Sequence, residues 1–199
     1  MKKSLILTII LAAVLLPACA EKVAPTLTIT PNLSAVPWTG GSVDVAINTI
    51  FPWKVTKSDD VVATVSKENG VGEDMITITV PETDKIETSS IKLTVNAKNG
   101  TGSVTKNAII TQEPKPFIGL DREKAAVSAN GGRLSFILTA NGEWKSSCST
   151  AGVTIEPKED GVGLYTLDVI VPASSTARTI TISFTTAEGA AAELKIEQK

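Results

Sequence analysis

The chain has 199 residues, with 19 basic and 21 acidic side chains and no histidine. The lack of histidine excludes catalytic couples that use imidazole as a base, and it excludes imidazole metal sites. The near-neutral charge provides no electrostatic footprint for a nucleic acid. Aromatic residues make up only 4% of the chain, which is few for a protein that stacks flat ligands. We therefore expect a protein that is not an enzyme and needs no cofactor.

Residues 1–18 have the features of a bacterial signal peptide. A basic start at Met1–Lys3 precedes an apolar run, Ser4–Leu16, which is shorter than the roughly 20 apolar residues of a membrane span. The run ends in Leu16-Pro17-Ala18-Cys19. This ending resembles a lipobox, although Pro17 departs from its usual pattern. The resemblance implies cleavage after Ala18 and a lipid, such as palmitate, on Cys19. The alternative is an ordinary signal peptide in which this cysteine occurs by chance.

A lipid on Cys19 would make the membrane a partner of the mature protein. Several acyl chains give lasting attachment, and residues 19–25 then form a short tether. Cleavage removes two lysines and leaves 17 basic against 21 acidic side chains, a net charge of −4. The other cysteine, Cys148, has no cysteine left to pair with, and with no histidine nearby we expect an idle, half-buried thiol.

The mature chain repeats itself at an offset of 91 residues. Tryptophan, glycine and proline positions match, and the two copies align without a gap until about residue 95 of the first. The matched segments include Gly40-Gly41 with Gly131-Gly132, Trp53-Lys54 with Trp144-Lys145, Gly70-Val71-Gly72 with Gly161-Val162-Gly163, and Val80-Pro81 with Val171-Pro172. So long a period indicates duplicated domains rather than solenoid units.

Each copy has the pattern of an all-β domain. Apolar residues alternate with polar ones, and the alternating segments are rich in threonine and valine. Glycine-containing turn signals separate about seven such segments in each copy. The alternating apolar sets are 43, 45 and 47, then 76, 78 and 80, then 91, 93 and 95 in the first copy, and 134, 136 and 138, then 167, 169 and 171, then 180, 182 and 184 in the second.

These patterns predict an all-β fold of two tandem immunoglobulin-like β-sandwich domains after a lipoprotein signal peptide. The first sandwich spans residues 26–113 and the second spans residues 117–199. Residues 114–116, which include two prolines, form a short, semi-rigid linker between them.

Both copies resemble the BACON domain, a Bacteroidetes-associated module named as carbohydrate-binding and often N-terminal. The resemblance rests on an ordered set of motifs: the Gly-Gly pair, the tryptophan that opens the next strand, the Gly-Val-Gly turn, and the closing segments Ile110-Thr111-Gln112 and Ile196-Glu197-Gln198. The second copy also carries Arg178 before a strand, where the first has Glu87. The resemblance implies a carbohydrate-binding function and an outer-membrane location, and it leaves the surface and periplasmic faces open.

The candidate binding residues are few. Trp53 and Trp144 occupy the same place in the two copies, so we expect both in the cores. Trp38 has no tryptophan counterpart and lies beside a turn, which suits either an exposed stacking platform or an inter-domain contact. If glycan binds, Trp38 would stack on the sugar, with Thr39 and Asn32 as hydrogen-bonding neighbours. We expect the acidic pairs at 59–60, 73–74 and 159–160 to be solvated turns, and no metal motif is present.

The sequence therefore predicts a non-catalytic, lipid-anchored protein of the cell envelope. In the first interpretation it recognises polysaccharide or mucin glycan. In the second it is a structural spacer that holds neighbouring envelope proteins near the membrane without binding sugar. A fimbrial subunit is a third and weaker interpretation, which requires a removable N-terminal segment and an exposed strand-pairing groove.

Overall fold

The computed structural model describes residues 23–58 and 62–199. The predicted signal peptide, Cys19 and the first part of the tether lie outside the described residues, as do Asp59 and Asp60. The described residues form 18 β-strands and no helix, so none of them forms a helix that could cross a membrane. The all-β prediction is confirmed.

The strands of residues 28–112 form two sheets that face each other as a sandwich, which we call domain 1. The first sheet has the order β1 (Thr28–Pro31), β3 (Gly41–Asn48), β7 (Asp74–Val80), β5 (Thr64–Val65). The second has the order β2 (Ala35–Val36), β9 (Gly102–Gln112), β8 (Ser89–Asn99), β4 (Pro52–Lys57), β6 (Asn69–Val71).

Residues 118–198 repeat this arrangement as domain 2. One sheet has the order β10 (Ile118–Leu120), β12 (Gly132–Ala140), β16 (Gly163–Val171), β14 (Thr154–Glu156). The other has the order β11 (Lys124–Val127), β18 (Ala191–Gln198), β17 (Arg178–Thr186), β13 (Trp144–Cys148), β15 (Glu159–Asp160). The strand pairs β2–β9 and β11–β18 are parallel, and the other pairs within the four sheets are antiparallel.

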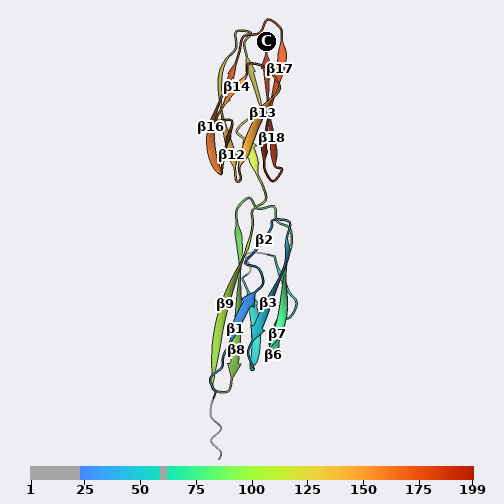
Figure 1. Ribbon diagram of the computed structural model, residues 1–199, viewed down its shortest axis with the longest axis vertical. Coiled ribbons are helices and arrows are strands. Elements are labelled where there is room, and N and C mark those ends of the chain that lie inside the picture. Colours follow the sequence, from blue (N-terminus) through green and yellow to red (C-terminus); the bar gives the residue numbers. More distant parts are fainter. Residues whose placement is uncertain (1–22, 59–61) are drawn as a thin grey trace, which may run out of the picture.

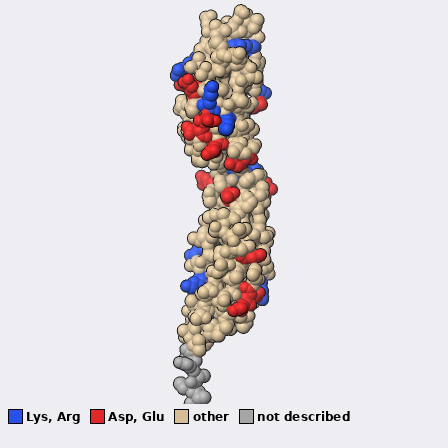
Figure 2. All heavy atoms as spheres, viewed as in Figure 1, with Lys and Arg blue, Asp and Glu red and all other residues tan. Residues whose placement is uncertain are grey.

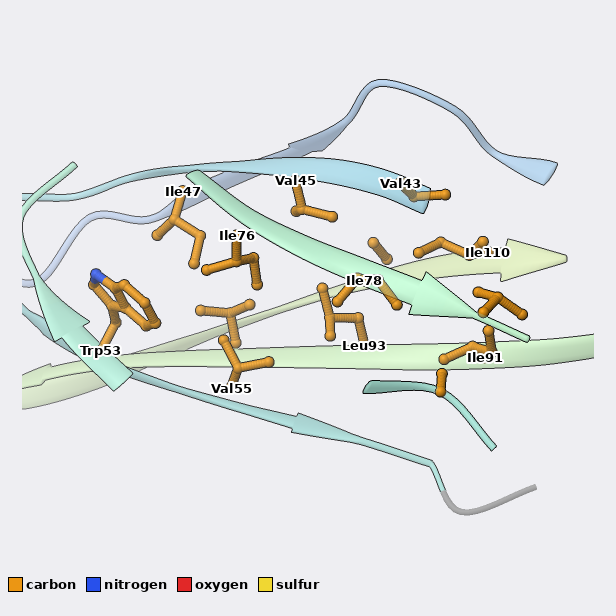
Figure 3. Packing of buried hydrophobic residues seen from close by; sticks show 14 of the residues in the cluster. Val43, Val45, Ile47, Trp53, Val55, Ile76, Ile78, Ile91, Leu93 and Ile110 are labelled. Atoms are coloured by element: carbon orange, nitrogen blue, oxygen red, sulfur yellow. The ribbon is translucent and has the colours of Figure 1, made fainter. Parts of the chain in front are cut away.

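The alternating apolar residues of the sequence fill the two cores. Successive strand residues point to opposite faces of a sheet, and Val43, Val45 and Ile47 are at most 1% exposed while their polar neighbours face outward. Figure 3 shows these side chains meeting Ile91 and Leu93 of the opposite sheet. Domain 2 is built in the same way around a separate cluster that includes Phe136, Leu167, Ile180 and Phe184.

The two sandwiches lie end to end along the long axis of the molecule (Figure 1). The first described residue, Val23, is held at the tip of the β8–β9 hairpin, where Asn99 Nδ2 and Thr101 Oγ1 donate hydrogen bonds to its carbonyl oxygen at 2.8 and 3.4 Å. The C-terminus lies at the opposite end of the molecule, at the far end of domain 2. Val23 and the C-terminus therefore lie at opposite ends of the two-domain molecule.

The junction between the domains contains direct polar contacts. Asn141, at the end of β12, donates from Nδ2 to the carbonyl oxygens of Ile86 in domain 1 and Lys115 in the linker, at 3.0 and 2.8 Å. Its Oδ1 accepts the backbone N–H of Phe117 at 2.7 Å. One side chain therefore joins domain 2, the linker and domain 1.

Candidate functional site

Trp38 lies in the turn between β2 and β3, at the end of domain 1 that faces the linker. Gly40 closes this turn with its N–H on the Pro37 carbonyl at 3.0 Å and has a φ of +85°. The Trp38 carbonyl accepts the N–H of Thr83 at 2.9 Å and Nε2 of Gln112 at 3.5 Å. The backbone at Trp38 is therefore fixed to the rest of the sandwich.

The indole of Trp38 is half-buried, and its exposed part meets the linker. Lys115 Nζ lies 5.3 Å from the ring centroid, within the range of a cation–π contact. The same ammonium forms an ion pair with Asp84, which raises the pKa of Lys115 above its usual value. Of the two roles that the sequence left for Trp38, these contacts favour a structural one at the domain junction.

The other two predicted sugar contacts do not form a shared site with Trp38. Thr39 follows it in the turn and is exposed. Asn32 follows β1, where its Oδ1 accepts the backbone N–H of Asp44 at 2.9 Å and its own N–H donates to the Asp44 carbonyl at 2.8 Å. Asn32 therefore closes the β1–β3 ladder, and no hydrogen bond within residues 23–58 and 62–199 joins it to Trp38.

The closing glutamines have a role that the sequence analysis missed. Gln112 and Gln198 are each 1% exposed at the ends of the last strands. Gln112 Nε2 donates to the Pro81 carbonyl at 2.7 Å, and Gln198 Nε2 donates to the Pro172 carbonyl at 2.9 Å. Arg178 Nε in turn donates to Gln198 Oε1 at 2.8 Å. A glutamine at an inward-facing strand position, where an apolar residue is expected, was the available signal.

The repeated tryptophans are in the cores, as predicted. Trp53 is 3% exposed and Trp144 is 1% exposed. Their surroundings nevertheless differ, because Trp53 Nε1 donates to the Gly72 carbonyl at 3.0 Å, whereas Trp144 Nε1 is buried with no hydrogen-bond partner. Tyr165 and Phe184 instead pack edge-on against Trp144, with ring centroids 5.7 and 6.0 Å away.

A one-residue shift between the domains accounts for the difference. Trp53 faces Gly70 across β4 and β6, but Trp144 faces Asp160 across β13 and β15, not Gly161. The expectation of a gapless repeat is therefore wrong as a description of structure over residues 154–160. Residues 154–160 occupy the positions that correspond to residues 64–70 of domain 1. The connection before β14 is one residue shorter than the one before β5, and the chain between Asp160 and Val171 is one residue longer than the chain between Gly70 and Val80.

The shift leaves a hollow beside Trp144 with a volume of about 450 Å³. It is lined by Glu143, Trp144, Lys145, Glu159, Asp160 and Gly161. Burial, followed by the charge and hydrogen bonding of Asp160, raises the pKa of Tyr165 beside it. In domain 1 the backbone of Gly70 covers the indole of Trp53 at the corresponding place.

The remaining candidate groups do not form a site. Asp74 pairs with Lys67, which lowers the pKa of the Asp74 carboxyl. Cys148 is half-buried, as expected, with Sγ 3.9 Å from the Thr150 carbonyl. Within the described ranges no group of three or more acidic or cysteine side chains could hold a metal ion. On the face in Figure 2, acidic and basic side chains are interspersed rather than gathered by sign.

Comparisons with known proteins agree on the fold. No family model matches the chain, and no curated protein matches it. The D00-D0 domain of Intimin is 11% identical, with a TM-score of 0.54, over 87% of this chain and 100% of that one. The two domains IG1+IG2 of DIP-gamma give 8% identity and a TM-score of 0.56, over 88% and 96%. The domain class is therefore immunoglobulin-like, in tandem, and at these identities the likeness extends to the fold alone.

Proposed function

We propose that this chain is a non-catalytic, lipid-anchored stalk of the cell envelope, with the lipid on Cys19. The observation that supports it is the placement of the chain ends. Val23, four residues after Cys19, is at the outer tip of domain 1, and the C-terminus is at the far end of domain 2. At about 3.3 Å per strand residue, the 11 residues of β8 and the 9 of β17 extend roughly 65 Å in line.

The lipid is tested by the two cysteines of the chain. Cys19→Ser should abolish incorporation of labelled palmitate and release the protein from the membrane fraction, because no other thiol is placed for acylation. Cys148→Ser is the matched control and should keep both properties. Labelling that persists in Cys19→Ser and disappears in Cys148→Ser would reject the anchor. Protease treatment of intact cells then distinguishes the surface from the periplasmic face.

The stalk is tested by energy transfer to the membrane. Thr101→Cys and Glu193→Cys, each in a Cys148→Ser background, place a donor dye at the tip of domain 1 or on domain 2 of the lipidated protein. With acceptor dye on vesicle headgroups, the donor at 101 should transfer efficiently and the donor at 193 weakly. Equal transfer from both positions would mean that the molecule lies along the membrane, which would reject a spacer role.

Glycan recognition is the second candidate, and the half-buried indole of Trp38 is the observation that favours it. A small-molecule site is concave and combines an aromatic wall with a few polar groups. Trp38 has part of its ring exposed, with Lys115 over it, whereas Trp53 and Trp144 are buried in the cores. Retention of the mature protein by a polysaccharide panel in affinity electrophoresis tests this function independently of the site that carries it.

A further inference from the structure

Four segments of chain meet at the tip of domain 1 where Val23 is held. They are residues 23–26, residues 48–52 between β3 and β4, residues 70–72 at the end of β6, and the β8–β9 turn, residues 99–102. Thr49 is 2% exposed, and its Oγ1 donates to the Thr26 carbonyl at 2.7 Å and accepts the N–H of Phe51 at 3.2 Å. Gly72 donates its N–H to the Phe51 carbonyl at 3.3 Å. Hydrogen bonds between the segments therefore fix the backbone of the tip.

The tip presents apolar side chains to its surroundings. Ile50 is 73% exposed, Val71 is 70% exposed and Val23 is 57% exposed. Val71 faces Pro52 across β4 and β6, so it lies in the segment next to Ile50. The four segments contain no charged residue, and the lowest part of the described chain in Figure 2 is tan. Single exposed apolar residues need no explanation, but a group of them in an uncharged patch is typical of an interaction site.

The duplication provides a comparison for this surface. At the offset of 91 residues, Ile50 corresponds to Asn141 and Pro52 corresponds to Glu143. In domain 2 this loop faces domain 1, where Asn141 donates to the carbonyl oxygens of Ile86 and of the linker. The same loop therefore has a hydrogen-bonding side chain where it meets a polar protein surface. Isoleucine at this place in domain 1 has no hydrogen bond to offer, which favours an apolar partner.

The length of chain before the tip indicates which apolar partner is within reach. Cys19 lies four residues before Val23, and a fully extended chain of this length spans roughly 13 Å. A lipid on Cys19 therefore holds the tip close to the bilayer surface. Proteins that lie in the membrane interface bury their apolar side chains about 5–10 Å into the boundary between headgroups and acyl chains. Ile50 and Val71 are placed to reach this boundary.

We infer that the tip of domain 1 docks on the lipid bilayer, with Ile50 and Val71 inserted among the lipid headgroups. The inference rests on the proposed lipid anchor and adds a second contact to it. Two side chains bury too little surface to bind lipid alone, but the anchor makes their binding an intramolecular event with a high effective concentration. The second contact opposes tilting of the domain about its tether, so it keeps the stalk upright.

Quenching of a dye on the tip tests the docking. The sample is the lipidated chain with Cys148→Ser and a dye on Val71→Cys, reconstituted in phosphatidylcholine vesicles. Val162→Cys is the matched control, because Val162 is also 70% exposed at the equivalent turn of domain 2. We expect lipids with a nitroxide at the headgroup to quench the dye at 71 at least threefold more than the dye at 162. Iodide in the water should quench the dye at 162 more.

A polar substitution beside the dye provides the second test. Ile50→Ser should reduce the nitroxide quenching at 71 at least twofold, while the protein still co-sediments with the vesicles because the lipid is unchanged. Leu164→Ser in domain 2, at a position that is 68% exposed, is the matched control and should leave the quenching unchanged. Both side chains are exposed, so neither variant should alter the melting temperature.

Each contrary result has a separate meaning. Co-sedimentation with equal nitroxide quenching at 71 and 162 leaves the anchor in place and rejects the docking. A dye at 71 that is shielded from iodide but unaffected by nitroxide lipid means that a second copy of the chain covers the tip, which also rejects the docking. A protein that does not co-sediment with the vesicles rejects the lipid anchor and the docking with it.

Discussion

At the scale of the residue, the same steric constraint requires glycine at the equivalent turn position of each domain. Gly40 and Gly131 have φ values of +85° and +75°, a region that non-glycine residues enter at a cost. A Cβ on either would lie 2.4 or 2.2 Å from the carbonyl oxygen of Val80 or Val171. The Gly-Gly motif that the two copies share therefore marks a place where a strand crosses close to the turn.

Substitution of these glycines is expected to be severe. Gly40→Ala should destabilise domain 1, and Gly131→Ala domain 2, each by about 1–3 kcal/mol or more because strain adds to the clash. Urea unfolding of the mature chain measures this. Gly100→Ala is the control, since a Cβ there meets nothing within 4 Å. Equal effects at all three positions would contradict the steric account.

The two core tryptophans are expected to respond differently to the loss of their N–H. Trp53→Phe leaves the Gly72 carbonyl without its donor, while Trp144→Phe removes a donor that has no partner. Trp53→Phe should therefore cost about 1 kcal/mol more than Trp144→Phe. Alanine at either position should cost about 3–5 kcal/mol, because it empties a large buried site. Calorimetry of the four variants checks both differences, and a larger cost for Trp144→Phe would be inconsistent with its unpaired N–H.

At the scale of the element, the last strand of each domain ends in a buried glutamine whose hydrogen bonds link the two sheets. Gln112 and Gln198 donate to carbonyl oxygens of the segments that follow β7 and β16. Each glutamine thus ties the end of its sheet to the opposite sheet of the sandwich. Burial of these amides is tolerated because they are hydrogen-bonded.

Replacement of the buried Gln112 amide by a carboxylate should make the stability of domain 1 depend on pH. The ionised side chain of Gln112→Glu would be buried beside the carbonyl oxygens of Trp38 and Pro81, to which the amide now donates, so burial and repulsion raise its pKa in the folded state. The folded state then binds more protons than the unfolded state, and stability should fall as pH rises from 4 to 8. Urea unfolding across this range measures the slope. Glu113→Gln, an exposed neighbour, should show no such slope, and a flat profile for Gln112→Glu would mean that the amide is not buried as described.

The sequence predicts those strands that are long enough for their apolar and polar residues to alternate and for the apolar ones to face a core. The long strands β3, β7, β8, β12, β16 and β17 have the expected buried residues, except that Leu134 of β12 is only half-buried. About seven strands were expected in each copy, and nine are present. The difference lies in elements such as β5 and β15, which are two residues long and too short to show a period.

The details of the candidate sites depend on contacts between distant residues and could not be predicted. Because the Gly-Val-Gly motif is identical in the two copies, aligning their sequences gives no sign of the shift that puts Asp160, and not Gly161, opposite Trp144. The role of Trp38 depends on Lys115, which lies 77 positions away in the sequence. Both the strand register at Trp144 and the contact between Trp38 and Lys115 depend on residues that are distant in the sequence. No pattern within a single segment can therefore indicate them.

At the scale of the whole molecule, a stalk requires a junction that does not bend freely. Interfaces between domains of one chain usually allow relative motion unless specific contacts oppose it. Here Asn141 bonds to both Ile86 and Lys115, and Lys115 contacts Trp38 and Asp84. These contacts join the linker to both domains, so they should hold the domains in line.

The measurement that tests this most directly is the distance between one spin label in each domain. Lys92→Cys and Glu193→Cys, with Cys19→Ser and Cys148→Ser, place the labels on exposed strand positions for double electron–electron resonance. The account predicts one narrow distance distribution, which Asn141→Ala broadens and the control Asn107→Ala leaves unchanged. A distribution that is already broad in the labelled parent, or one that Asn141→Ala does not alter, would contradict it.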